Sequence, residues 1–246
     1  MRLAALIPAR YGAQRLPGKP LADIGGVPMV VRVARLAKAA KGIDEVAVAT
    51  DDDRIAAAVR ADGFRAVMTS PACKNGTERI AQAARELPAD GYLNVQGDEP
   101  LLDPKAIEAL AALVREGHAM STLARPLLPG EDVTAPALCK VVLGEEGQAL
   151  YFSRAAIPFA RTAGQVQPLI HIGLYGFSKQ YLQQFANLPE TALERAEGLE
   201  QLRALAHGHR IQVGLGFWNS IAVDTPEDLE RVRAAVAANE TTRRFS

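Results

Sequence analysis

The chain has 246 residues, of which 48% are hydrophobic and 23% charged, a composition that allows a full core and argues against disorder. Its 28 basic and 28 acidic residues cancel, which argues against nucleic-acid-coating and membrane-surface proteins, because both need a basic excess. The apolar stretch before Pro8 is too short for a signal peptide, and no run approaches the ~18 apolar residues of a membrane span. The only two cysteines, Cys73 and Cys139, are not clustered, which fits a reducing compartment better than a disulfide scaffold. Taken together, these features predict a cytoplasmic protein that binds no nucleic acid and spans no membrane.

Strand-like and helical patterns alternate through the first half of the chain. Short apolar runs predict strands at 3–7, 45–50, 64–69 and 91–95. Apolar residues at helical spacing predict helices at 28–42, 51–61 and 77–87, and Asp103-Pro104 is typical of a further helix start. Because strands that alternate with helices form βαβ units, this half predicts an α/β fold with a mainly parallel sheet.

The second half has a different pattern. Strand-like pieces at 120–125, 138–143 and 149–153 are separated by turns such as 145–147, which predicts an antiparallel insertion. After a polar loop at 160–168 we expect a strand at 169–177, helices at 178–187, 190–196 and 197–207, strands at 211–216 and 221–223, and a helix at 225–239. The sequence has no internal repeat and no low-complexity linker.

A cationic loop follows the first expected strand. It carries Arg10, Arg15 and Lys19, and no acid occurs before Asp23. Arginine forks and a lysine point charge suit a ligand with several negative charges, such as a nucleoside triphosphate; scattered surface cations are the alternative. The loop is no Walker A motif, because Lys19 is followed by Pro20 instead of serine or threonine.

Two aspartates follow apolar runs. Asp98 comes after the strand expected at 91–95, and Asp224 after the run 221–223. Ligands of a parallel sheet bind beyond the carboxyl ends of its strands, where Mg²⁺ takes one or two carboxylates together with phosphate oxygens. Thr225 can cap the helix that starts there, so Asp224 is not needed as the cap. The pair predicts a single Mg²⁺ site, and an ordinary turn is the alternative for Asp98.

Several other positions have both a functional and a structural interpretation. Asn75-Gly76 and Thr77 fit either a ligand loop or a turn followed by a helix cap. Residues 51–53 are expected only to supply acids to a helix N-terminus. His171 and Tyr175 are four apart in one expected strand, so they share a face and either bind a ligand or pack.

These motifs together resemble one family over residues 3–235. In chain order they are IPARYGAQRLPGKPL, ATDDDRI, NGTERI, NVQGDEP, ALYFSRAAIPF, HIGLYGF, LEQLRAL and VDTPEDL. The chain resembles the 3-deoxy-manno-octulosonate (Kdo) cytidylyltransferases, also called CMP-Kdo synthetases. The resemblance implies a mononucleotide-binding α/β fold, Rossmann-like and of the nucleotide-diphospho-sugar transferase type. It also implies one domain over 1–246, with a β-rich sugar-binding and dimerisation insertion at about 120–190, and a homodimer.

The implied reaction is the Mg²⁺-dependent transfer of CMP from CTP to the anomeric hydroxyl of Kdo, with release of pyrophosphate, for lipopolysaccharide or capsule biosynthesis. Such a transfer needs positioning and charge neutralisation more than a nucleophilic side chain. The residues that the resemblance implies are catalytic Arg10, Arg15, Lys19, Asp98 and Asp224, with Mg²⁺ on Asp98 and Asp224; CTP-binding Ala9, Arg10, Lys19, Ser70, Asn75, Gly76 and Gln96; and sugar-acid-binding Arg79, Gln96, Arg154, His171, Tyr175, Glu200 and Gln201.

The chain departs from the family pattern at two notable positions. Asn75 stands where the family usually has serine, and Ile170 where it usually has a basic residue. Both lie near the expected cytidine and sugar pockets. The alternatives are therefore a cytidylyltransferase for another 2-keto sugar acid, either 8-amino-Kdo or a sialic-acid-like sugar, and a non-catalytic nucleotide-binding paralogue.

Overall fold

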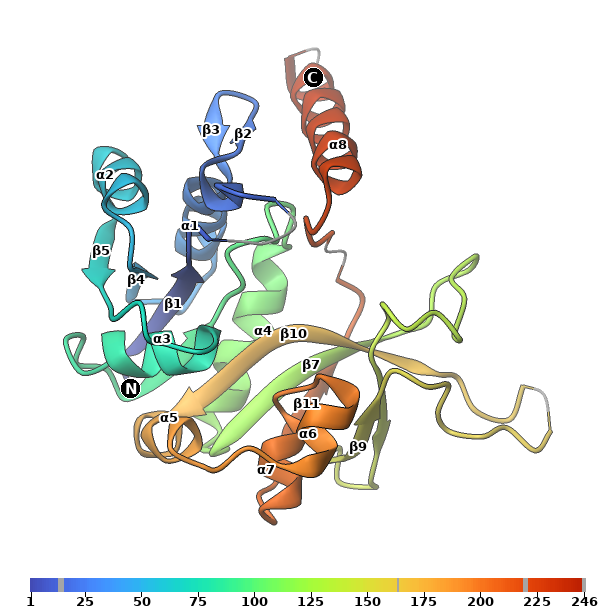
Figure 1. Cartoon of the computed structure of the whole chain (residues 1–246). Coiled ribbons are helices and arrows are strands. Elements are labelled where there is room, and N and C mark those ends of the chain that lie inside the picture. Colours follow the sequence, from blue (N-terminus) through green and yellow to red (C-terminus); the bar gives the residue numbers. More distant parts are fainter. Residues whose placement is uncertain (13–15, 163, 219–220, 245–246) are drawn as a thin grey trace.

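A mixed β-sheet runs through the centre of the structure, a computed structural model that describes residues 1–12, 16–162, 164–218 and 221–244 (Figure 1). The elements in chain order are β1 (Leu3–Ala9), the 3-10 helix η1 (Lys19–Leu21), β2 (Asp23–Ile24), β3 (Val27–Pro28), α1 (Met29–Ala39), β4 (Glu45–Thr50), α2 (Asp53–Ala61), β5 (Arg65–Met68), α3 (Gly76–Ala83), β6 (Gly91–Asn94), α4 (Pro104–Arg115), β7 (Met120–Pro126), β8 (Lys140–Leu143), β9 (Ala149–Ser153), β10 (Leu169–Ser178), α5 (Lys179–Ala186), α6 (Ala192–Glu197), α7 (Leu202–Ala206), β11 (Gln212–Leu215) and α8 (Pro226–Arg244).

The strand order confirms the α/β prediction with a mainly parallel sheet. Across the described ranges the main sheet has the order β11-β7-β10-β6-β1-β4-β5, and β8 and β9 extend it beside β10. β1 lies between β4 and β6 and is parallel to both, with Ala4 opposite Glu45 on one side and opposite Tyr92 on the other. This arrangement brings the carboxyl ends of β1 and β6 to the same edge of the sheet.

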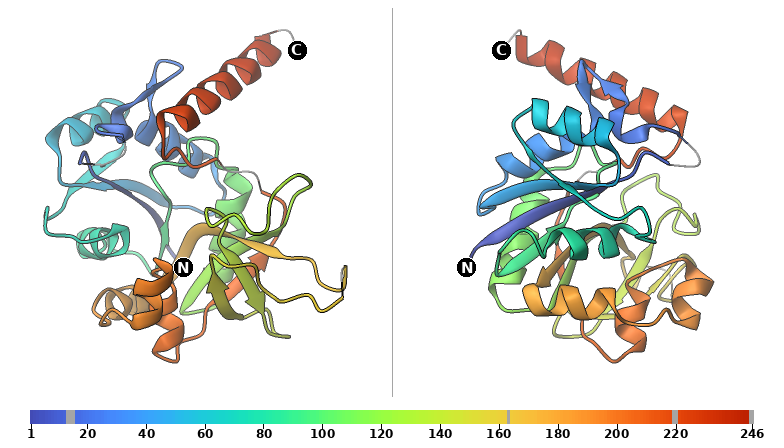
Figure 2. Two further views of the ribbon diagram at one scale, coloured as in Figure 1. Left: turned by 45° about the vertical axis from the view of Figure 1, so that its right-hand side comes forward. Right: turned by 60° about the vertical axis from the view of Figure 1, so that its left-hand side comes forward.

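The sequence of β1 explains why the sheet is covered on both faces. Its residues point alternately to opposite faces, so Ala4 and Leu6 enter one core while Leu3, Ala5 and Ile7 enter the other. Helices α1, α2 and α4 pack on the second of these cores, and α3, α5 and α7 pack on the first. The two helix layers lie on opposite sides of the strands in Figure 2. A strand buried on both faces needs the continuous apolar run that predicted it.

The antiparallel insertion is also confirmed. β10 pairs antiparallel with β6, β7 and β8, and β8 pairs antiparallel with β9. Because β10 pairs with both β6 and β7, the insertion and the parallel half share one sheet. The connection between β9 and β10 extends away from the body of the molecule in Figure 1, and its Phe159 is 91% exposed.

Some expected elements were wrong in extent. Residues 221–223 form no strand; instead the backbone N–H of Val223 donates to the carbonyl of Asp98 over 2.9 Å. α3 ends at Ala83 instead of 87, because tighter turns follow and Pro88 disfavours a helical residue before it. The helix expected at 197–207 is limited to α7, because Gly198 ends α6 with a positive φ of 61°.

The β2–β3 hairpin was not expected. It turns at Gly25 and Gly26, both with positive φ, and leads directly into α1. A third apolar cluster joins Ile24 of this hairpin and Met29 of α1 to Val223 and to Leu229 and Val232 of α8. α8 begins at Pro226 behind the expected cap, since Thr225 and Asp228 bond reciprocally as a capping box. Among the described residues, no helix combines the length and apolar character needed to cross a membrane.

Candidate active site

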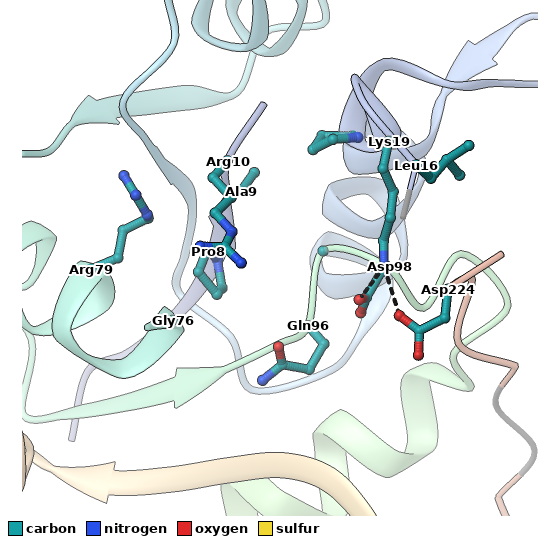
Figure 3. A pocket seen from close by; sticks show the side chains of 12 residues that line it. Pro8, Ala9, Arg10, Leu16, Lys19, Gly76, Arg79, Gln96, Asp98 and Asp224 are labelled. Carbon is teal, nitrogen blue, oxygen red and sulfur yellow. Dashed lines mark hydrogen bonds and ion pairs between the residues drawn. The ribbon is translucent and has the colours of Figure 1, made fainter. Parts of the chain in front are cut away.

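A cavity of about 460 Å³ opens at the carboxyl edge of the parallel strands (Figure 3). It is formed by the end of β1, the loop after β6, the N-terminus of α3, the η1 turn and the segment that precedes α8. Predicted site residues that line it are Ala9, Arg10, Lys19, Gly76, Arg79, Gln96, Asp98 and Asp224. Arg15 lies outside the described residues.

Three chain segments meet at the side chain of Lys19. Its Nζ lies 2.7 Å from Oδ2 of Asp98 and 3.2 Å from Oδ1 of Asp224. The turn that presents it depends on Gly18, whose φ of 71° favours glycine and whose N–H donates to the carbonyl of Tyr11 over 3.1 Å. The Val223–Asp98 backbone bond brings the second carboxylate to the first. The two predicted strand-end aspartates therefore do converge, although one of them follows no strand.

The carboxylate pair has the donor set that Mg²⁺ prefers. Asp98 and Asp224 already converge on one cationic atom, the ammonium nitrogen of Lys19. No group of three or more His, Cys, Asp or Glu gathers within the described ranges, so further ligands would be substrate phosphates and water. One or two carboxylates completed by phosphates and water are usual for Mg²⁺, so the residues present fit this ion.

The N-terminus of α3 approaches the end of β1 closely. A Cβ on Gly76 would lie 3.1 Å from the side chain of Pro8, so glycine permits this approach. The helix is capped by Asn75, whose Oδ1 accepts from the N–H of Glu78 over 2.8 Å. The structural interpretation of Thr77 as the cap was therefore wrong, and its hydroxyl has another partner. Ser70 is not among the residues that line the main cavity; it lines a separate depression with Cys73 and Gln82.

Arg79 is buried on the α3 side of the cavity, with 3% of its surface exposed. Its guanidinium donates to Thr69 Oγ1 over 2.6 Å and to Asp51 Oδ2 over 2.9 Å. The cap of α2 is Asp52, so Asp51 is more than the helix-start acid expected from the sequence. The structure places Arg79 beside β4, and its contact with a sugar acid stays a prediction.

A second group of predicted residues gathers on β10 and α7. The rings of His171 and Tyr175 are 5.5 Å apart between centroids, which confirms that they share a face. Tyr175 donates through its hydroxyl to Gln201 Oε1 over 2.9 Å. Thr122 donates its proton to the carbonyl of Leu174 over 2.6 Å, so Nε2 of His171, 2.9 Å from that hydroxyl, must be the donor between them. Burial lowers the pKa of His171 to about 3, so the ring is neutral.

Glu200 adjoins this group and has an unusual environment. Thr77 Oγ1 donates to its Oε2 over 3.0 Å, whereas its Oε1 is buried with no hydrogen bond, 3.7 Å from the guanidinium of Arg203. That guanidinium is already paired with Glu194 through two nitrogens. Burial raises the pKa of Glu200 to about 7, against the lowering effect of the Thr77 hydrogen bond.

Arg154 faces main-chain groups. Its guanidinium donates to the carbonyls of Glu197 and Pro136, each over 2.8 Å, and to that of Gly198 over 3.4 Å. It therefore satisfies the carbonyls at the C-terminus of α6 and ties them to the loop before β8. The structure gives Arg154 this structural role, and its contact with a sugar acid stays a prediction.

Sequence reasoning missed the residues that connect the two groups. Asn94 is 2% exposed at the end of β6, and its Nδ2 lies 3.5 Å from Thr77 Oγ1. Gln96 Nε2 in turn lies 3.4 Å from Asn94 Oδ1. The available signal was an asparagine within the apolar strand GYLN, because a buried amide requires partners.

Comparisons with known proteins identify the family of the chain. A family described as Cytidylyltransferase matches residues 4–211. The chain is 53% identical over 241 residues, 96% of its length and 98% of the relative's, to a 3-deoxy-manno-octulosonate cytidylyltransferase of Anaeromyxobacter sp. (strain Fw109-5). It is 44% identical over 246 residues, 97% of its length and all (100%) of the relative's, to an 8-amino-3,8-dideoxy-manno-octulosonate cytidylyltransferase of Shewanella sp. (strain ANA-3).

A solved structure is similar over the whole fold. It is a CMP:2-keto-3-deoxy-manno-octonic acid synthetase complexed with CTP, and it superposes with a TM-score of 0.93 at 40% identity. The match covers 97% of this chain and 100% of the other. The chain therefore belongs to the cytidylyltransferase family, and its resemblance to the 3-deoxy-manno-octulosonate cytidylyltransferases is confirmed.

Proposed function

We propose that this protein transfers CMP from CTP to the anomeric hydroxyl of Kdo and releases pyrophosphate. The observation that carries the proposal is the convergence of Lys19, Asp98 and Asp224 in one cavity. Gln96, which also lines this cavity, is connected to Glu200 of the second polar group through Asn94 and Thr77. The identity to Kdo cytidylyltransferases supports the choice of both substrates.

The protein's part in the reaction is to position two anions and to balance their charge. Arg10 and Lys19 line the cavity from opposite sides in Figure 3, so both can contact the triphosphate through charge-assisted hydrogen bonds. A correctly held hydroxyl attacks the α-phosphorus as the bond from that phosphorus to the pyrophosphate oxygen breaks. Orientation of this kind removes much of the entropic barrier, and no nucleophilic side chain is required.

Asp98 and Asp224 would hold Mg²⁺. When bound there, the ion supplies positive charge to the phosphate oxygens and lowers the pKa of a coordinated hydroxyl. The Lys19 ammonium contacts the same two carboxylates. We infer that this ammonium would also contact the triphosphate.

The neighbouring polar group would recognise the sugar acid. His171 is neutral, and because its Nε2 donates to Thr122, its Nδ1 is the acceptor nitrogen of the ring. Tyr175, Gln201 and Glu200 add hydroxyl, amide and carboxyl groups on the same side. Such a set suits the several hydroxyls of an octulosonate, and Arg79, which lines the main cavity, is the cation that we assign to its carboxylate.

We also propose a cytoplasmic homodimer whose product serves lipopolysaccharide or capsule assembly. Support for self-association comes from apolar side chains exposed on the insertion, with Phe159 91% and Leu150 58% exposed. A second candidate substrate is 8-amino-Kdo, which the 44% identical Shewanella relative favours. The intact cluster of one lysine and two aspartates argues against a non-catalytic paralogue.

Pyrophosphate release tests the proposal. The purified protein is assayed with Mg²⁺ and each of CTP, UTP, ATP and GTP, alone and with Kdo, 8-amino-Kdo or a sialic acid. Release that requires both CTP and Kdo is the expected result. Faster release with 8-amino-Kdo would change the sugar, and no release with any pair would favour the nucleotide-binding paralogue.

A further inference from the structure

We propose that Thr77 and Asn94 are positioning residues that fix the amide of Gln96 according to the charge of Glu200, and so join the nucleotide side of the site to the sugar side. The inference rests on the proposed function, because Gln96 and Glu200 belong to the site described there. Neither Thr77 nor Asn94 belongs to the predicted set of ligand-binding residues.

The hydrogen bonds form a series in which every donor points toward Glu200. Thr77 Oγ1 donates to Glu200 Oε2 over 3.0 Å, Asn94 Nδ2 points to Thr77 Oγ1 at 3.5 Å, and Gln96 Nε2 points to Asn94 Oδ1 at 3.4 Å. Thr77 and Asn94 are 1% and 2% exposed, so solvent does not compete for these groups. Since Asn75 caps α3, the Thr77 hydroxyl is not needed at the helix end.

Proton counting sets the direction. An ionised carboxylate only accepts, so the single hydroxyl proton of Thr77 goes to Glu200. The Thr77 oxygen must then accept, which requires Asn94 to present its NH₂ group. Asn94 consequently turns its carbonyl to Gln96, and Gln96 presents its NH₂ group in return. The charge on Glu200 thereby determines the orientation of an amide that lines the main cavity.

The result for Gln96 is an acceptor on the cavity side. In Figure 3 the amide oxygen of Gln96 points toward the side on which Pro8 and Arg10 are drawn, and its nitrogen, which donates to Asn94, points away from that side. An acceptor there selects a substrate group that donates, such as a sugar hydroxyl or the cytosine amine, and disfavours a carbonyl. If Glu200 lost its charge, every hydrogen bond of this series could reverse its direction. Gln96 would then present its NH₂ group to the cavity instead of its oxygen.

Glu200 is placed to be sensitive in this way. The charged groups around it are Glu78 from α3, Glu194 from α6 and Arg203 from α7, and Tyr175 faces it from β10. Arg203 is engaged by Glu194, so Glu200 is only partly neutralised. Burial raises the pKa of Glu200 to about 7, and the hydrogen bond from Thr77 opposes this rise. Thr77 therefore favours the charged form that keeps the series in its observed direction.

The test compares Thr77→Val, which removes the hydroxyl at nearly constant shape, with Thr77→Ser, which retains it. We expect Thr77→Val to lower kcat/KM for the sugar acid about ten-fold or more, because a hydrogen bond to a charged group is lost. The rising limb of the pH profile of kcat/KM should move to higher pH, and Thr77→Ser should restore both. Thr134→Val is the matched control, since it removes an exposed hydroxyl that donates to Asp132 over 2.7 Å, away from the site.

A second variant and a second readout make the test independent of folding and of turnover. Asn94→Asp cannot donate to Thr77 and should move the pH limb in the same direction. Carbon-13 NMR of substrate-free protein should show a higher pKa for Glu200 in Thr77→Val than in Thr77→Ser. Unchanged limbs and an unchanged Glu200 pKa in both variants would overturn the inference. A wild-type protein that turns over no sugar acid while the NMR shift appears would overturn the proposed function and leave the hydrogen-bonded series standing.

Discussion

Nζ of Lys19 and Oδ2 of Asp98 are 2.7 Å apart, although 79 residues separate them in the sequence. Asp224, 205 residues from Lys19, contacts the same nitrogen at 3.2 Å. The Lys19 nitrogen thus joins three segments: its own turn, the loop after β6 and the segment before α8. Lys19 therefore holds the two carboxylates together as an assembled pair, which is the arrangement that the proposed Mg²⁺ site requires.

Replacing either carboxylate should remove most of the activity. Asp98→Asn and Asp224→Asn each take one oxygen ligand from the pair, and we expect kcat to fall about 100-fold or more, with a higher Mg²⁺ requirement. The measurement is pyrophosphate release as a function of Mg²⁺ concentration. Asp53→Asn, at an exposed acid in the first turn of α2, is the control. Substantial Mg²⁺-dependent turnover in either active-site variant would refute the metal assignment.

Lys19→Met should act mainly on CTP. The variant keeps the length of the side chain and loses its charge, so we expect KM for CTP to rise about ten-fold or more at saturating Mg²⁺. Initial rates across CTP concentrations measure this effect. Lys38→Met, at an exposed lysine in the last turn of α1, should leave KM unchanged. Equal KM values for the two variants would mean that Lys19 makes no contact with the triphosphate.

Two of the arginine–aspartate pairs in the parallel half, Arg79–Asp51 and Arg35–Asp62, should contribute differently to stability. Arg79→Met leaves the partly buried Asp51 without its guanidinium, and we expect the free energy of unfolding to fall by ~3–5 kcal/mol. Arg35→Met breaks the exposed pair with Asp62 and should lower the free energy of unfolding far less, because solvent screens exposed charges. Denaturant unfolding measures both. The double variant Arg79→Met/Asp51→Leu should recover part of the loss, and no recovery would point to packing instead of charge.

Glu200 should make stability depend on pH. Its folded pKa of about 7 lies above the ordinary 4.5, so the folded protein keeps this proton at pH values where the unfolded chain has lost it. The resulting stabilisation is complete below about pH 4.5 and disappears as pH rises through about 7. The free energy of unfolding of the wild type, relative to Glu200→Gln, should therefore decrease over this range. Glu145→Gln, at an exposed turn, should parallel the wild type, and a flat difference for Glu200→Gln would contradict the raised pKa.

Elements with one dominant physical cause were predictable from the sequence. The run EVAVAT was expected at 45–50 and forms β4 over the same residues, because a strand buried on both faces must be apolar throughout. The run 221–223 is equally apolar but is no strand, since burial of Val223 comes from the third cluster and its N–H bonds a loop. An apolar run indicates that a segment is buried. It forms a strand only if the fold places another strand beside it. The hairpin at Gly25-Gly26 did have a local signal, because paired glycines favour such turns.

The site was predictable where residues follow strand ends, as Asp98 does after β6. It was not predictable where a contact joins two side chains that are distant in the sequence. Asp51 pairs with Arg79, and Thr77 bonds Glu200 instead of capping α3, because Asn75 satisfies the helix end first. Each outcome depends on competition for a single donor or acceptor, and neighbours in sequence do not reveal which partner is close in space.

The second carboxylate lies outside the main sheet, and the backbone bond from Val223 to Asp98 joins its segment to the loop after β6. The family match ends at residue 211, and the last strand of the main sheet ends at Leu215, so Asp224 belongs to neither. Its position depends on α8 and on the third apolar cluster, which is packed against the β2–β3 hairpin. Weakening that cluster, for example at Val232, would leave the strand order intact and still release one half of the carboxylate pair. Changes in the C-terminal helix can therefore tune catalysis without passing through the core of the sheet.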